Sequence, residues 1–215
     1  MTQLKKQDVI LIFQSIRDNL EKHKDELTKL DSELGDGDLG LTMCKGFQII
    51  CNNIEQLKSE SDIGVFIKRL GLAMSDAVPS TMGTLLSLGI MKAGNAVEGK
   101  QQIDVQDTAK MLSSAADAIA ACGKTKRGDK TILDALYPAL DKLQKKLAQD
   151  CSFQEAARAT WDGAAAGAES TKKMKSTIGK AAIYGEQSIG KQDPGATVAV
   201  IIFEGIFYCL NANHA

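Results

Sequence analysis

The chain has 215 residues, of which 44% are apolar and 25% are charged, and its formal net charge is −1. This balance argues against a general nucleic-acid binder and against a membrane-surface protein. The N-terminus lacks the apolar core of a signal peptide, and the longest apolar run, near residues 198–203, is too short to span a bilayer. The length allows one large domain or two small ones, and we expect a globular, cytoplasmic protein.

Aromatic residues make up 5% of the sequence and there are three prolines, which favours an all-helical fold. Apolar residues three and four positions apart predict eight helices. The expected helices cover about 5–29, 40–57, a segment with Val65 to Met74, Pro79 to about Ala96, 105–121, a segment with Leu133 to Leu143, 152–173 and 196–211. Residues 175–195 are dotted with glycine and predict a long functional loop that acts as a lid.

The cysteines and histidines give no sign of a disulfide framework or a zinc site. The five cysteines have no paired close spacing and are expected to be reduced core thiols. The two histidines are His214, in the tail, and His23, in a charged run that we expect on a solvated helix face. A phosphohistidine or catalytic histidine is therefore not expected.

An acidic stretch at residues 31–42 is the strongest functional signal. Asp31, Asp36 and Asp38 fall within eight residues, separated by glycines. Their spacing does not stack them on one helix face, so we expect a loop that folds three carboxylates toward one point. Hard oxygen ligands of this kind suit Mg²⁺ or Ca²⁺, and the spacing is not that of an EF-hand.

The apolar stretch after this loop predicts a helix whose first N–H groups face an anion. Carboxylates for a metal beside N–H groups for phosphate indicate a metal–nucleotide site. The alternative is an Asp/Gly turn with solvated acids, in which Asp38 only caps the next helix.

A second glycine-bounded segment, residues 123–131, concentrates basic residues and contains Gly-Lys-Thr. A P-loop needs Gly-x-x-x-x-Gly-Lys-Ser/Thr after a strand. Here a helix is expected before the segment and the first glycine of the motif is missing. We therefore reject a P-loop.

Three separated motifs together resemble the nucleotide-binding L subunit of dihydroxyacetone kinase, over nearly the whole chain. They are Asp31-x4-Asp36-Gly37-Asp38, the segment Gly128-Asp129-Lys130-Thr131-Ile132-Leu133-Asp134-Ala135-Leu136, and the segment from Tyr184 to Ala196. The resemblance implies a single domain over residues 1–215, an up-and-down barrel of eight helices with a nucleotide at one end. It also implies two Mg²⁺ ions held by Asp31, Asp36 and Asp38, and no catalytic residue in this chain.

The same resemblance implies a set of nucleotide contacts, spread over several helix starts and loops. These are Leu39, Gly40, Leu41, Thr42, Ser80, Thr81, Met82, Gly123, Ile132, Lys180, Asp193, Pro194 and Gly195. The chain departs from the family pattern at a few of them. Leu39 and Thr42 replace a usual His and Asn, residues 79–83 replace a Gly-Gly-x-Ser-Gly segment, and Lys180 replaces an Arg, which removes bidentate phosphate recognition.

The resemblance also implies partners. Dihydroxyacetone sits on a separate K subunit, and in the phosphotransferase-system type a histidine phosphoprotein, the M subunit, rephosphorylates bound ADP. A homodimer is left open. Competing interpretations are an ATP-dependent kinase subunit for another short ketose, a non-catalytic regulatory paralogue, and a plain helical scaffold with an acidic metal-binding loop.

Overall fold

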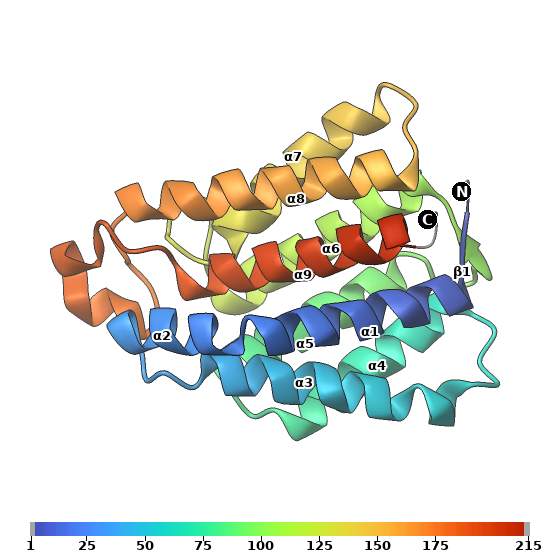
Figure 1. Ribbon diagram of the computed structural model, residues 1–215, viewed down its shortest axis with the longest axis horizontal. Coiled ribbons are helices and arrows are strands. Elements are labelled where there is room, and N and C mark those ends of the chain that lie inside the picture. Colours follow the sequence, from blue (N-terminus) through green and yellow to red (C-terminus); the bar gives the residue numbers. More distant parts are fainter. Residues whose placement is uncertain (1–2, 213–215) are drawn as a thin grey trace.

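The computed structural model describes residues 3–212 as a bundle of long helices with very little strand (Figure 1). His214 lies outside the described residues. The α-helices are α1 (Lys6–Lys22), α2 (Lys24–Leu34), α3 (Leu39–Asn53), α4 (Ile63–Ala77), α5 (Thr81–Asn95), α6 (Val105–Gly123), α7 (Leu133–Leu147), α8 (Phe153–Ser170) and α9 (Pro194–Ala212). Three short 3-10 helices are η1 (Glu55–Leu57), η2 (Thr171–Lys173) and η3 (Lys180–Ser188), and strands β1 (Leu4–Lys5) and β2 (Gln102–Ile103) pair antiparallel.

The helices form a closed ring. Each helix from α3 to α9 packs on the next one in the sequence, and α9 closes the ring against α1, which with α2 packs on α3. The all-helical fold predicted from the sequence and the up-and-down barrel implied by the family resemblance are therefore confirmed. The additional α-helix within residues 3–212 comes from the first predicted helix, which is two helices.

The break between α1 and α2 lies at His23, which we expected on a solvated face of one continuous helix. Its imidazole instead joins the two helices to α9. Nδ1 lies 2.7 Å from a carboxylate oxygen of Glu26, and Nε2 lies 3.2 Å from one of Glu204. Helix α2 then continues to Leu34 and carries Asp31 to the end of the barrel.

Successive helices from α2 to α9 run in opposite directions, so the starts of every second helix lie at the same end of the barrel. Helices α3, α5, α7 and α9 begin at the end of the barrel where α2, α4, α6 and α8 finish. Strand β1 and the last turn of α9 lie at the opposite end (Figure 1). The acidic loop between α2 and α3 is thus surrounded by helix N-termini, which carry positive partial charge and free N–H groups.

Helix α9 is the most apolar helix of the ring. By length and composition alone it could cross a membrane, but its apolar face is buried against α1, α7 and α8. It therefore acts as a core helix. The ring interior holds an apolar cavity of about 260 Å³, lined by side chains that include Phe13, Phe47 and Phe203.

The cysteines only partly follow the sequence expectation. All five are free thiols, and Cys44 and Cys209 are buried in the core. Cys122, near the end of α6, is exposed, so the expectation of a core position is wrong for that residue.

Helices α7 and α8 approach each other closely at two glycines of α8. A Cβ atom at Gly167 would lie 2.1 Å from the backbone oxygen of Asp134, and one at Gly163 would lie 2.5 Å from that of Pro138. A proline has no N–H, so Pro138 leaves the oxygen of Asp134 without its helical donor. The glycines therefore let α8 pack directly over this part of α7.

Gly167→Ala should destabilise the protein, although alanine is the better helix former by about 1 kcal/mol. The new methyl group would force the two helices apart, at a cost of about 1–3 kcal/mol. Urea unfolding followed by circular dichroism measures the change. Ala166→Gly, at an exposed position of the same helix, is the control and should cost about 1 kcal/mol. A Gly167→Ala variant more stable than wild type would contradict the close approach.

Candidate functional site

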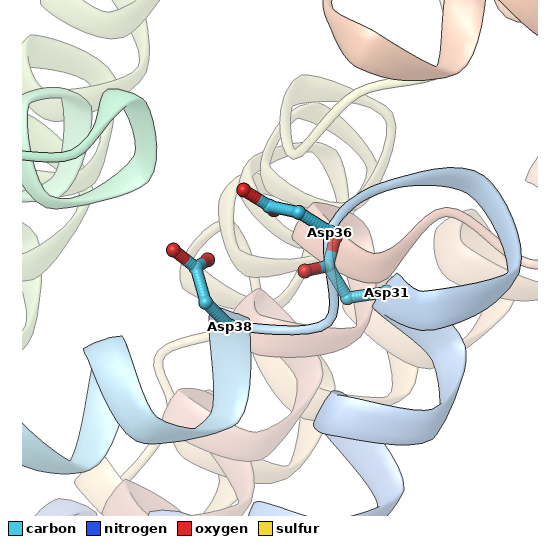
Figure 2. A group of neighbouring side chains, drawn as sticks. All are labelled: Asp31, Asp36 and Asp38. Atoms are coloured by element: carbon cyan, nitrogen blue, oxygen red, sulfur yellow. The ribbon is translucent and has the colours of Figure 1, made fainter.

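Three carboxylates meet at the end of the barrel (Figure 2). One oxygen each from Asp31, Asp36 and Asp38 lies within 4.8 Å of the others. The sequence predicted this convergence, but it placed Asp31 in the loop. Asp31 lies in the last turn of α2, Asp36 lies in the connection, and Asp38 is the residue before α3.

The glycines of the connection allow the chain to turn back over Asp31. A Cβ atom at Gly35 would lie 2.4 Å from a carboxylate oxygen of Asp31. Gly37 has a φ of +74°, and a Cβ atom there would lie 2.4 Å from the Ser32 hydroxyl oxygen. Residues with side chains would therefore displace the loop, and Asp36 and Asp38 with it.

The three acids have different electrostatic surroundings. Burial raises the pKa of Asp31, and the nearby charges of Asp36 and Asp38 raise it further. The Lys180 ammonium forms an ion pair with Asp36 and lowers the pKa of that carboxyl. The same contact raises the pKa of Lys180. One cation from η3 thus offsets part of the charge of the cluster.

Asp38 does not serve as a simple helix cap. Its carboxylate accepts no capping hydrogen bond from α3 within the described chain, which contradicts the alternative of a capped turn. The N–H of Leu39 points to Asp31 Oδ2 at 3.3 Å. Gly40 lets α3 cross α2, since its Cβ would lie 2.2 Å from the Lys24 oxygen. The Leu41 side chain is 58% exposed.

A second group of predicted residues gathers where α5, α7 and α9 begin. A Cβ atom at Gly195 would lie 2.7 Å from Met82 Cε and 3.4 Å from the backbone nitrogen of Ile132. The Ser80 hydroxyl accepts a hydrogen bond from the Gly83 N–H at 2.9 Å and so caps α5. Three separated predicted segments therefore meet at these helix starts.

Other predicted residues lie at the edges of this group. Gly123 is the last residue of α6, and a Cβ there would lie 3.6 Å from Leu85 of α5. The Thr81 side chain is exposed and Thr42 is half-buried. Pro194 is buried as the first residue of α9.

Asp193 is buried rather than exposed beside a ligand. Its carboxylate accepts a hydrogen bond from the Ala196 N–H at 2.7 Å and caps α9. Its own N–H donates to the Thr171 hydroxyl at 2.9 Å. We expected Asp193 to order the lid through a bound nucleotide, and the structure instead gives it contacts within the protein.

The predicted loop at 175–195 contains the 3-10 helix η3, with a break at Gly185 where φ is +51°. Sequence reasoning also missed Lys130, which is only 2% exposed. Its ammonium donates to backbone oxygens of Met174, Ser188 and Lys191. The one sign of its importance in the sequence was its place in the Gly128–Leu136 motif. Composition alone cannot distinguish a buried lysine from a solvated one in a basic loop.

The donor set tests whether a metal ion fits the cluster. Its convergent ligands are carboxylate oxygens, and helix N–H groups lie beside them. Oxygen ligands select hard cations such as Mg²⁺, which usually binds one or two carboxylates and fills its other positions with water and phosphate. The residues therefore fit such an ion.

Comparison with known sequences identifies the family. The pattern of the DAK2 domain family matches residues 33–208. The chain belongs to the DAK2 domain family.

Among similar members of the family is the ADP-binding subunit DhaL of the PEP-dependent dihydroxyacetone kinase of Escherichia coli. It is 33% identical over 178 residues, which cover 83% of this chain and 84% of that protein. A DhaL subunit of Listeria innocua is 33% identical over 186 residues, with 86% of each chain covered. Both relatives are subunits of kinases, which are phosphotransferases.

Longer relatives share the same region. The D-erythrulose kinase of Mycolicibacterium smegmatis is 30% identical over 199 residues, which cover 92% of this chain but 34% of that protein. The crystal structure of the dihydroxyacetone kinase of C. freundii superposes with a TM-score of 0.72 at 25% identity, over 93% of this chain and 34% of the other. The DAK2 fold of this chain thus corresponds to about a third of those proteins.

Asp193 should make the stability of this DAK2 domain depend on pH. Burial raises its pKa to about 7; Asp134 adds to the shift and Lys130 opposes it. The folded value exceeds the unfolded value of about 3.9, so the folded state holds the proton more tightly. The resulting stabilisation is complete below about pH 4 and is lost as the pH rises through about 7.

Asp193→Asn keeps an acceptor for the Ala196 N–H and should remove this decline. Urea midpoints from pH 4.5 to 8 measure it. The control Asp76→Asn changes an exposed acid, and its curve should follow wild type. A decline in Asp193→Asn equal to that of wild type would contradict the assignment.

Proposed function

We propose that this chain is the nucleotide-binding subunit of a dihydroxyacetone kinase, or of a kinase for a related short ketose, and that residues 1–215 form one DhaL-type domain. The observation that carries the proposal is the meeting of Asp31, Asp36 and Asp38 within 4.8 Å at the barrel end where four helices begin. The similarity to DhaL proteins, which are ADP-binding subunits, supports it.

Asp31, Asp36 and Asp38 would hold two Mg²⁺ ions. When bound, these ions neutralise charge between the carboxylates and the phosphates of the nucleotide. The dihydroxyacetone kinase of C. freundii has been crystallised in complex with AMP-PNP and Mg²⁺, which is consistent with a metal–nucleotide pair. The chain contributes fixed carboxylates on α2 and before α3, so little reorganisation accompanies binding.

The nucleotide would lie over the starts of the odd-numbered helices. The first N–H groups of α3 lie beside Asp38 and would face the phosphates. Met82, which is half-buried, would give the nucleotide an apolar contact, beside the buried Ile132 and Gly195. Leu39 to Thr42, Ser80, Thr81, Gly123 and Pro194 would lie around them. Asp193 would act on the nucleotide indirectly, because it fixes the first turn of α9.

The Lys180 ammonium would bind the phosphates of the nucleotide. It already lies at the cluster through its ion pair with Asp36, and its exposed, flexible side chain can follow negative charge. A lysine offers a point charge and not the planar fork of an arginine. It would therefore bind phosphate with less geometric selectivity than the arginine of other family members.

Phosphoryl transfer depends mainly on positioning and on neutralising charge. Residues 3–212 place no His or other evident general base beside the aspartates. We therefore propose that a K-type subunit carries the ketose and supplies the base, and that it docks at the barrel end bearing the cluster. In the phosphotransferase-system type, an M-type histidine phosphoprotein would recharge bound ADP, and the assembly would work in the cytoplasm.

A second candidate substrate class is a four-carbon ketose. Relatives include D-erythrulose and L-erythrulose kinases at 30% and 27% identity. Leu39, Thr42 and Lys180 depart from the family pattern, but they lie at the nucleotide end of this chain. The choice of ketose would instead be made by the K-type partner, which is proposed to carry it. The nucleotide role is common to both candidates.

Asp36→Asn and Asp38→Asn should abolish retention of ADP while the helical circular dichroism stays unchanged, because neither side chain belongs to the core. Isothermal calorimetry with wild type should show ADP binding with Mg²⁺ and little binding with EDTA. Each variant should lose about 30-fold or more in affinity with Mg²⁺, as expected when one partner of a close charge contact is removed.

The matched control is Asp18→Asn, which removes the same charge from an exposed position of α1, away from the barrel end that bears the cluster. Its affinity for Mg²⁺–ADP should equal that of wild type. Equal ADP binding in Mg²⁺ and EDTA, or unchanged affinity in the cluster variants, would favour a plain helical scaffold.

The 215-residue chain alone should not phosphorylate dihydroxyacetone, even with ATP. We propose that the ketose lies on a K-type subunit, and donor and acceptor must come within about 3–3.5 Å. Product formation is measured for the chain alone, for the chain with a K subunit and ATP, and for the chain with K and a phosphorylated M-type donor. Turnover in the second mixture indicates nucleotide exchange, and turnover only in the third indicates an ADP relay. Robust turnover by the isolated chain would exclude the subunit role, and no turnover in any mixture with either ketose would favour a regulatory paralogue.

A further inference from the structure

The segment 174–191 carries Lys180 to the aspartate cluster but has almost no core of its own. Its two buried residues are the serines Ser176 and Ser188. Its large apolar side chain Ile183 is 88% exposed. Apolar burial therefore cannot hold this segment in place, and its position depends on polar contacts.

The strongest of these contacts converge on Lys130. Its ammonium donates to the backbone oxygens of Met174, at 3.1 Å, of Lys191, at 2.7 Å, and of Ser188. A lysine has three donors, so all of them are used on this segment. Met174 begins the segment and Lys191 ends it, so a single side chain fastens both ends.

Lys130 is itself held firmly. Asp134 of α7 accepts hydrogen bonds from the N–H groups of Gly128, at 2.5 Å, and Thr131, at 2.8 Å. The Lys130 backbone adopts a φ of +63°, which is unfavourable for a residue with a Cβ atom. A glycine would fit this backbone better. The contribution of residue 130 is therefore its lysine side chain, because its backbone conformation alone would favour a glycine.

The remaining contacts of the segment lead to other parts of the chain or are internal. The Gly190 N–H donates to the Lys172 oxygen at 2.7 Å, and Lys180 and Lys191 pair with Asp36 and Glu33. The Ser176 N–H donates to the Ser188 hydroxyl at 2.9 Å, and Lys175 pairs with Glu186 within the segment. The Thr177 hydroxyl reaches the Asp129 oxygen at only 3.4 Å. Loss of the Lys130 ammonium would therefore free the segment, including η3, from the loop before α7.

We propose that Lys130 is a positioning residue that binds the backbone of segment 174–191 and so places Lys180 at the metal–nucleotide site. This inference rests on the proposed nucleotide function. It predicts that Lys130 affects nucleotide affinity through Lys180, although Lys130 is buried beneath the segment and is not itself proposed to contact the nucleotide.

Limited trypsin proteolysis without ligand tests the attachment, because Lys175, Lys180 and Lys191 are cleavage sites within the segment. Lys130→Met keeps the aliphatic stem, and Lys130→Gly suits the backbone. Both should speed cleavage at these sites roughly tenfold or more, since hydrogen bonds to a charged group are lost and local opening becomes easier. The urea midpoint should shift little, because the helical ring is unchanged.

The matched control is Lys126→Met, in the same loop but exposed. Its cleavage pattern within the segment, followed by mass spectrometry, should equal that of wild type. Cleavage of the Lys130 variants at the wild-type rate would overturn the attachment. Accelerated cleavage throughout the chain with a lowered urea midpoint would assign Lys130 to global stability and would also overturn the proposal.

A double-mutant cycle on Mg²⁺–ADP affinity tests the action through Lys180. Lys130→Met and Lys180→Met should each weaken binding, and the double variant should be no weaker than the weaker single variant within about twofold, because coupled residues are not additive. Effects that multiply would overturn the positioning role. Wild-type protein that binds no ADP would overturn the proposed function and this coupling with it, whereas failure of the proteolysis test alone would overturn only the attachment.

Discussion

Mutual repulsion between three carboxylates is the constraint on which this end of the molecule depends. One oxygen each from Asp31, Asp36 and Asp38 lies within 4.8 Å of the others, so their negative charges repel one another and nearby positive charge offsets the repulsion. The protein meets this constraint in several ways. Asp31 is partly buried and its pKa is raised, Lys180 pairs with Asp36, and the helix N-termini around the cluster contribute positive partial charge. The barrel holds these acids in a fixed arrangement that favours a cation.

Much of this arrangement could be predicted from the sequence, because its signals are local. The spacing of Asp31, Asp36 and Asp38 with intervening glycines predicted their convergence, and composition with helical periodicity predicted an all-helical fold. The closed barrel was implied by the family resemblance. The helix starts that meet around Gly195 came from the family resemblance and not from periodicity. The acidic loop could thus be recognised from its local sequence alone. The group at Met82 and Ile132 could be predicted only from the family resemblance over nearly the whole chain.

The features that were missed depend on contacts between distant residues. The break at His23 is stabilised by Glu204, which is 181 positions later in the sequence, and periodicity alone favoured one helix. Lys130 was noted only as one of several basic residues in the segment rejected as a P-loop and as a member of the Gly128–Leu136 motif, since its three acceptors are backbone oxygens that leave no mark on the sequence. Asp193 was expected beside a ligand, but local capping of α9 took precedence.

The orientation of the ring also limits how another domain can be joined to it. The last turn of α9 lies at the end opposite the aspartates (Figure 1), and α9 has 19 residues. At about 1.5 Å per residue it spans about 28 Å. In longer relatives this region is a third of the chain. A domain joined after α9 would therefore need a linker that runs back along this length to reach the aspartates of the same barrel. At about 3.3 Å per extended residue, such a linker takes roughly nine residues or more.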